Sequence, residues 1–140
     1  MTKDKKLSDN FWIKEFNYVD PHDDLLFLLQ KAREELGQSI TITKDGGSTR
    51  TFKEHFNIYY KRYADDFYKH IPWGSRHLPK YNTGLRAVDI SSDGVTGKEL
   101  SYLLKDIADM YNIHIGLGVG KNWVHIDVDR KCYATWSYNY

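Results

Sequence analysis

The chain has 140 residues and carries 20 Lys and Arg against 19 Asp and Glu, which gives a formal net charge of +1 at pH 7. This length fits one domain with its own core. The nearly balanced charge does not require a strongly basic surface, so composition gives no case for nucleic-acid binding. The single cysteine, Cys132, excludes a disulfide within the chain.

Residues 1–10 are polar and contain no apolar stretch. We therefore expect a flexible N-terminal segment, with neither a secretory signal peptide nor a transmembrane helix. The sequence predicts one domain over residues 1–140, in a monomer that is made in the cytoplasm. We expect no membrane partner and no nucleic-acid partner.

The first predicted helix begins near Asp20 and Pro21, because proline favours the first helical position. An apolar stripe at helical spacing gives this helix a buried face, and it consists of Leu25, Leu28, Leu29, Ala32 and Leu36. Gly37 is placed to end the helix. Residues 39–43 then alternate in polarity, which predicts a strand.

Two further helices are predicted from capping boxes, in which Ser or Thr is followed three residues later by Glu. Thr51 and Glu54 begin one of these helices, which is expected to end before Pro72. Thr96 and Glu99 begin the other.

The remaining elements are strands. Residues 86–91 predict a short strand, and residues 112–118 and 123–130 both alternate in polarity. The connection between the last two contains Gly120, so they are expected to form a hairpin. The order is thus helix, strand, helix, strand, helix and hairpin. It predicts an α+β domain, with an antiparallel sheet and helices packed on one side.

The strand predicted at residues 123–130 has two different faces, because side chains alternate along a strand. The apolar face is expected to contact the core and consists of Val124, Ile126 and Val128. The opposite face carries Trp123, His125 and Asp127, with the imidazole and the carboxylate about 7 Å apart along the backbone. An ordinary hydrogen-bonded pair on a sheet surface would give the same pattern.

A second carboxylate and a second imidazole stand near the strand at residues 86–91. Asp89 lies between Val88 and Ile90, where a lone carboxylate is costly unless it is paired or bound to a metal. His77 precedes that strand in a predicted loop. Two His and one Asp leave one position of a tetrahedral zinc open, which is the pattern of catalytic zinc sites.

Four motifs occur in order: residues 75–78 (SRHL), 84–90 (GLRAVDI), 116–118 (GLG) and 123–128 (WVHIDV). Together they resemble the zinc D-Ala-D-Ala carboxypeptidase and murein peptidase family, which shares its fold with the signalling domain of hedgehog. The resemblance covers nearly the whole chain. It implies a hedgehog/DD-peptidase-like fold and one zinc ion per chain.

The resemblance also implies roles for individual residues. His77, Asp89 and His125 match the family's zinc ligands, and the substrates are stem peptides of bacterial peptidoglycan. Members include bacterial enzymes and phage endolysins. The sequence does not separate a carboxypeptidase from an endopeptidase.

The sequence departs from the family in two places. Residues 79–83 look inserted between the first two ligands, and Asn122 stands where many members have an acid three residues before the last ligand. Asp127 is the candidate replacement for that acid, as the catalytic base. The alternative is that Asp127 orients a ligand.

Three residues are candidates for substrate binding. By the resemblance, Ser75 and Arg50 lie near the substrate, and Arg50 would bind a carboxylate. An exposed loop arginine is the alternative for Arg50. Trp123 shares the face of His125, so it either forms a wall of the substrate site or packs beside the sheet.

The leading hypothesis is therefore a zinc-dependent peptidase that acts on the cell wall. A second is a zinc-binding module without catalysis, such as a component of a phage particle. A third is a metal-free structural or binding protein that keeps the fold.

Overall fold

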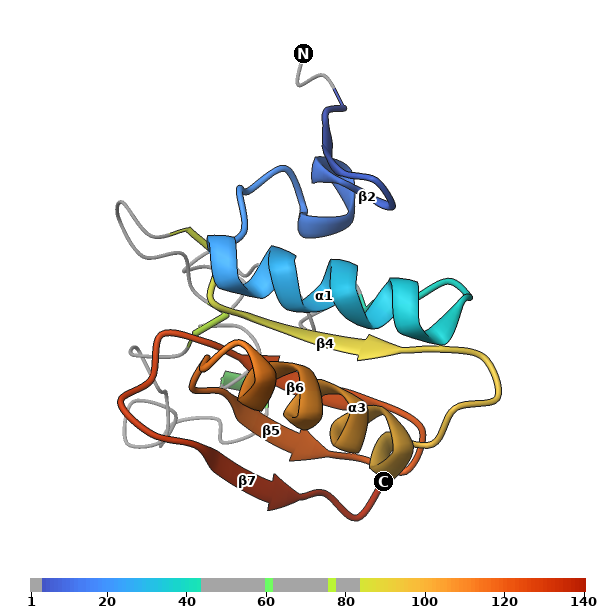
Figure 1. Cartoon of the computed structure of the whole chain (residues 1–140), viewed down its shortest axis with the longest axis vertical. Coiled ribbons are helices and arrows are strands. Elements are labelled where there is room, and N and C mark those ends of the chain that lie inside the picture. The colour runs from blue at the N-terminus through green and yellow to red at the C-terminus, as the bar shows by residue number, and fades with distance from the viewer. Residues whose placement is uncertain (1–3, 44–59, 62–75, 78–83) are drawn as a thin grey trace.

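The computed structural model describes residues 4–43, 60–61, 76–77 and 84–140. It shows a small single-domain α+β protein (Figure 1). Among the described residues, the main sheet has five strands in the order β3-β4-β6-β5-β7. The strands are β3 (Thr41–Ile42), β4 (Ala87–Ser91), β5 (Gly116–Val119), β6 (Val124–Asp127) and β7 (Ala134–Ser137).

The strand directions correct one part of the sequence prediction. β3, β4, β6 and β5 pair antiparallel in that order, as expected, but β7 pairs parallel to β5. The sheet is therefore mixed rather than antiparallel. β5 and β6 form the predicted hairpin, although each strand is shorter than its predicted range.

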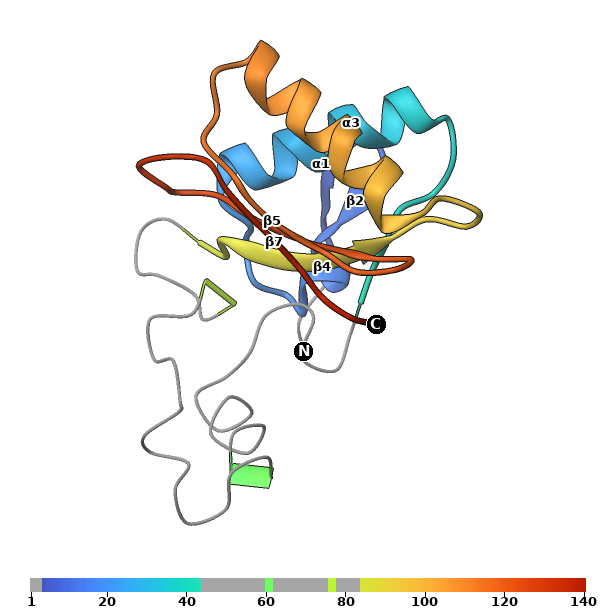
Figure 2. The same ribbon diagram turned by 90° about the horizontal axis from the view of Figure 1, so that it is seen from below.

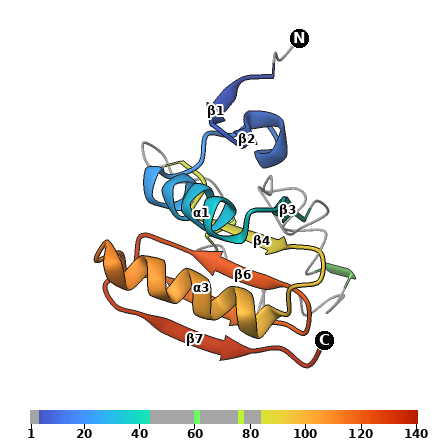
Figure 3. The ribbon, with the colours of Figure 1, turned by 45° about the vertical axis from the view of Figure 1, so that its right-hand side comes forward.

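The helices cover one face of this sheet. Figure 2 shows α1 (Asp23–Leu36) and α3 (Gly97–Met110) on the same side. α3 contacts β5 and β6, and α1 lies beside α3 (Figure 3). The prediction of helices packed on one side is confirmed. Within the described part of the chain, no helix has the length and apolar character needed to cross a membrane.

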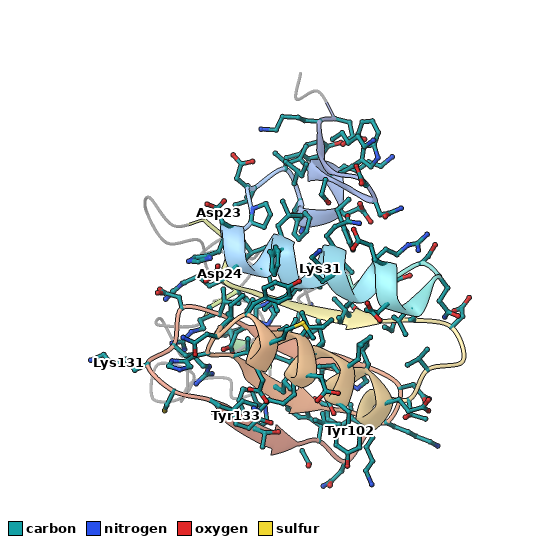
Figure 4. The ribbon with its side chains drawn as sticks, viewed as in Figure 1. Asp23, Asp24, Lys31, Tyr102, Lys131 and Tyr133 are labelled. Atoms are coloured by element: carbon teal, nitrogen blue, oxygen red, sulfur yellow. The ribbon has the colours of Figure 1, made fainter. Side chains whose placement is uncertain are left out.

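The helix ends follow from local chemistry. α1 begins two residues later than predicted, because the His22 imidazole accepts the Asp24 N–H and caps the helix, while Pro21 forms a bridge to Leu85. Asp23 lies in the first turn (Figure 4), where a negative charge is favourable. Gly37 ends the helix with φ 66°, as predicted.

α3 begins as predicted, with a capping box in which Thr96 accepts the Glu99 N–H and the Glu99 carboxylate accepts the Thr96 N–H. The helix predicted from Thr51 lies outside the described residues except for Tyr60 and Lys61, which are helical.

Part of the segment expected to be flexible, residues 1–10, takes part in a strand pair. Lys6–Ser8 forms β1, which pairs antiparallel with β2 (Phe11–Trp12) and is followed by a short 3-10 helix at Ile13–Phe16. The apolar side chains of Phe11 and Phe16 are fully buried and hold this segment against the core.

The core lies between the sheet and the helices. Its strand residues are the alternate, fully buried side chains of β4 and β6: Val88, Ile90, Val124 and Ile126. Its helix residues include Leu25, Leu28, Leu29, Leu100 and Leu104. The alternate residues Asp89 and His125 consequently project from the sheet face that the helices do not cover.

Candidate metal centre

The centre of the site is a pair of residues that face each other on adjacent strands. Asp89 of β4 is the register partner of His125 of β6. Their side chains share one sheet face, and His125 Nδ1 lies 3.1 Å from Asp89 Oδ1. Both side chains are largely buried, with exposed fractions of 20% for Asp89 and 12% for His125.

His77 joins this pair from outside the sheet. Its neighbour Arg76 donates from Nε to the carbonyl of Val128 and from Nη2 to that of Asp129, and the Arg76 carbonyl accepts the Arg86 N–H. These bonds fasten the backbone beside His77 to the ends of β4 and β6.

His77 is consequently buried against the other two residues. Its Nε2 lies 3.7 Å from Asp89 Oδ1, and its ring centroid lies 5.2 Å from that of His125.

The spacing of these three residues fits a metal ion. One nitrogen or oxygen atom from each of His77, Asp89 and His125 lies within 4.8 Å of the others. Ligand atoms bound at about 2.1 Å to a tetrahedral zinc are about 3.4 Å apart. The separations of 3.1 Å and 3.7 Å from Asp89 Oδ1 bracket this value. The group could therefore hold a metal ion.

Asp127 lies directly beside this group, on the same strand as His125. Its Oδ2 is 2.7 Å from His125 Nε2. Arg130 donates to both carboxylate oxygens, from Nε to Oδ1 and, at 2.9 Å, from Nη2 to Oδ2. Arg76 Nε lies 3.9 Å from Oδ1. With an exposed fraction of only 2%, this carboxylate depends on these cations for its charge.

The charges of this network shift two pKa values. Burial works against ionisation of Asp127, but hydrogen bonds from Arg130 and His125 and their positive charges lower its pKa to about 2. Burial also works against protonation of His125, yet hydrogen bonds to Asp127 and Asp89 raise its pKa above the ordinary value of 6.5. The pKa of His125 rises because its imidazole lies between two carboxylates.

An aromatic ring completes the surroundings of His125. Trp136 of β7 lies with its ring centroid 5.4 Å from that of His125, and the guanidinium of Arg130 lies 5.5 Å from the Trp136 ring. Gly118 of β5 lies between β6 and β7, and its lack of a side chain leaves room for the contact of Trp136 with His125.

The candidate substrate residues are less completely described. Arg50 and Ser75 lie outside the described residues. Trp123 is described, and its ring stacks on Tyr138 and Tyr140 at centroid distances of 4.9 Å and 5.7 Å. Its indole N–H donates to the Tyr140 carbonyl. These contacts favour packing beside the sheet over a wall of the substrate site.

Two residues of the site were not found by sequence reasoning. Arg130 follows Asp127 by three residues, a spacing that signals contact in a helix but not after a strand. Trp136 lies in the aromatic-rich end of the chain, where the sequence gives no sign that β7 pairs with β5. Asp89 and His125, in contrast, were recognisable as polar residues within apolar strands.

Comparisons of this chain with models of protein families, with curated proteins and with solved structures gave no match.

Proposed function

We propose that the protein is a zinc-dependent peptidase with a single metal site formed by His77, Asp89 and His125. The observation that carries the proposal is the convergence of these three side chains from β4, β6 and the turn at His77. Two imidazole nitrogens and one carboxylate oxygen are a typical donor set for catalytic zinc, with the fourth position left for water or substrate.

Held by these three residues, a zinc ion would lower the pKa of its water to about 7 and would polarise a substrate carbonyl. The protein's contribution is to place three ligands within reach of one point and to keep His125 oriented. Asp89 contributes negative charge to the donor set and contacts both imidazoles. A metal ion held by two imidazoles and one carboxylate, with a position open for water, supports hydrolysis of a carbonyl compound such as a peptide.

Within this proposal, Asp127 orients His125 rather than acting as the catalytic base. Its carboxylate is occupied by Arg130 on both oxygens and by His125 on one. A carboxylate whose pKa is about 2 is a poor proton acceptor near neutral pH. By accepting the proton on His125 Nε2, it leaves Nδ1, which faces Asp89, for a metal ion.

The substrate class in this proposal rests on the sequence resemblance. The motifs around Ser75, Asp89 and His125 resemble those of peptidases that cleave stem peptides of bacterial peptidoglycan. We therefore infer an activity on short wall peptides, as a carboxypeptidase or an endopeptidase.

Digestion of purified peptidoglycan, followed by mass spectrometry of the released peptides, tests the proposal. The zinc-loaded wild type should create new peptide ends, and His125→Ala should create none. His114→Ala is the matched control, since His114 is exposed and lies outside the three-residue group. Full activity in His125→Ala would contradict the proposal.

A second candidate is a zinc-binding module that does not catalyse. The engagement of Asp127 by Arg130 favours it, because this pairing withholds the carboxylate that the sequence offered as a base in place of Asn122. This candidate predicts one bound zinc and no new peptide ends in the same digestion.

A further inference from the structure

The strand next to His125 carries no side chains on the face of the candidate site. On that face of β5, Gly116 is the register partner of Asp127 and Gly118 is the register partner of His125. Along its other edge, β5 pairs with β7, and there Gly118 is the register partner of Trp136. On this face, the strand between the site and β7 therefore presents two glycines, which have no side chains.

Backbone conformation does not explain these glycines. Neither has a positive φ, whereas Gly37, Gly84 and Gly94 do. The explanation is space. A Cβ atom on Gly116 would contact the Arg130 guanidinium and lie 2.5 Å from Asp127 Oδ1. A Cβ atom on Gly118 would lie 2.6 Å from Trp136 Nε1. Both separations are well below normal van der Waals contact.

Two side chains use this space to reach the site. Arg130 lies over Gly116 and donates to both oxygens of Asp127, which contacts His125 Nε2. Trp136 lies over Gly118 and contacts the His125 ring itself, at a tilt of 46°. The guanidinium also lies near the Trp136 ring, so the two supports contact each other.

We propose that Arg130 and Trp136 are positioning residues that hold His125 in its metal-binding orientation, and that Gly116 and Gly118 are glycines because these two side chains must cross β5. The inference rests on His125 being a metal ligand, as in the proposed function. Arg130 acts through Asp127 on one ring nitrogen, and Trp136 restrains the ring plane. Loss of either support leaves all three ligands present and weakens metal binding.

The test measures zinc affinity of the full chain by competition with a chromophoric chelator, without any substrate. Arg130→Gln should weaken zinc binding about 10-fold to 100-fold, as is usual when a partner that orients a ligand is lost. Trp136→Ala should weaken it about 10-fold. The conservative variants Arg130→Lys and Trp136→Phe should recover part of each loss.

Gly118→Ala provides an independent arm, because it alters neither a ligand nor a support. The added methyl group should displace the Trp136 ring and lower zinc affinity like Trp136→Ala. In the double variant Gly118→Ala/Trp136→Ala, the loss of zinc affinity should be smaller than the sum of the two single losses, because the ring that the methyl group displaces is already absent. Tyr138 also borders this space, so some additional effect remains.

Cobalt bound in place of zinc gives a second readout, since its visible absorption spectrum reports the geometry of the ligands. Arg130→Lys and Trp136→Phe should shift this spectrum while far-UV circular dichroism stays that of the wild type. Matched controls are Arg33→Gln on α1, which lies on the helix-covered side of the main sheet, and Trp12→Phe on β2, which belongs to the separate two-stranded sheet. The controls should change neither zinc affinity nor the cobalt spectrum.

Wild-type zinc affinity in folded Arg130→Gln, Trp136→Ala and Gly118→Ala would overturn the inference. The proposed function fails separately. A wild type that binds zinc and cleaves no peptide, with weakened binding in these variants, contradicts the peptidase and supports the positioning roles. A wild type that binds no zinc overturns both.

Discussion

The two faces of the main sheet are built from neighbouring residues of the same strands and differ in almost every physical respect. Toward the helices, β4 and β6 present fully buried apolar side chains, such as Val88 and Ile126. On the other face they present Asp89, His125 and Asp127, linked by hydrogen bonds.

Burial of the apolar face stabilises the fold. The polar face gathers groups whose desolvation is unfavourable unless they are paired. The residues that stabilise the fold and those of the candidate site are therefore only one position apart along each strand.

The largest expected effect on stability lies on the helix-covered face. Ile126→Ala should lower the free energy of unfolding by about 4 kcal/mol, because it leaves a cavity in a closely packed core. Its neighbour His125→Ala should lower that of the metal-free protein by less, about 2 kcal/mol, because it removes hydrogen bonds to Asp89 and Asp127 without opening a cavity in the apolar core. Urea denaturation of both metal-free variants measures the difference. Equal losses would contradict the separation of the two faces.

Zinc should stabilise the protein through the polar face alone. At a free concentration about 100 times its Kd, zinc should raise the free energy of unfolding by about 2.7 kcal/mol. The increase should vanish in His125→Ala, which lacks one ligand, and persist in His114→Ala. Denaturation with zinc and with a chelator checks this expectation, and stabilisation that survives in His125→Ala would place the metal elsewhere.

Acid should weaken the polar face through Asp127. The pKa of this carboxyl is lowered from 3.8 to about 2 in the folded protein. The resulting stabilisation, about 2 kcal/mol, is present above pH 4 to 5 and is lost as the pH falls through about 2. Asp127→Asn lacks this contribution.

Between pH 5 and pH 2, the metal-free wild type should therefore lose about 2 kcal/mol more than Asp127→Asn. Urea denaturation at several pH values measures the two losses. Identical losses would show that Arg130 and His125 do not lower the pKa of Asp127.

A smaller change in the helical layer should leave the site untouched. Thr96→Ala removes the side chain that caps α3 and should reduce the free energy of unfolding by about 1 kcal/mol. Zinc affinity should stay that of the wild type, since α3 lies on the opposite side of the sheet. Weakened zinc binding in this variant would show that the two faces are coupled.

The elements recognisable from sequence were those with a local signal. Gly37 ends α1 as its position predicted, and Thr96 with Glu99 begins α3. The alternation of β6 correctly separated Ile126, in the core, from His125 on the other face. In each case the signal lies within a few residues of the element that it defines.

The elements that sequence reasoning missed depend on distant contacts. β7 pairs parallel with β5, and nothing within Ala134–Ser137 specifies that neighbour or its direction. The position of Trp136 beside His125 follows only from this pairing and from Gly118. Arg130 reaches Asp127 around a turn in which Asp129 has a φ of 63°, a conformation that its sequence does not announce.

The candidate site divides in the same way. Asp89 and His125 were visible as polar residues within apolar strands, whereas their pairing across β4 and β6 required the register. His77 was a candidate from its position before the strand at residues 86–91 and from the resemblance, but its place beside Asp89 and His125 depends on the bonds of Arg76.

The zinc content of the purified protein, measured by elemental mass spectrometry, tests the central claim most directly. The wild type should contain about one zinc per chain, with His77→Ala and His125→Ala close to none and His114→Ala equal to the wild type. A wild type that holds no zinc after refolding with the metal present would contradict the account, as would full retention of zinc in both ligand variants.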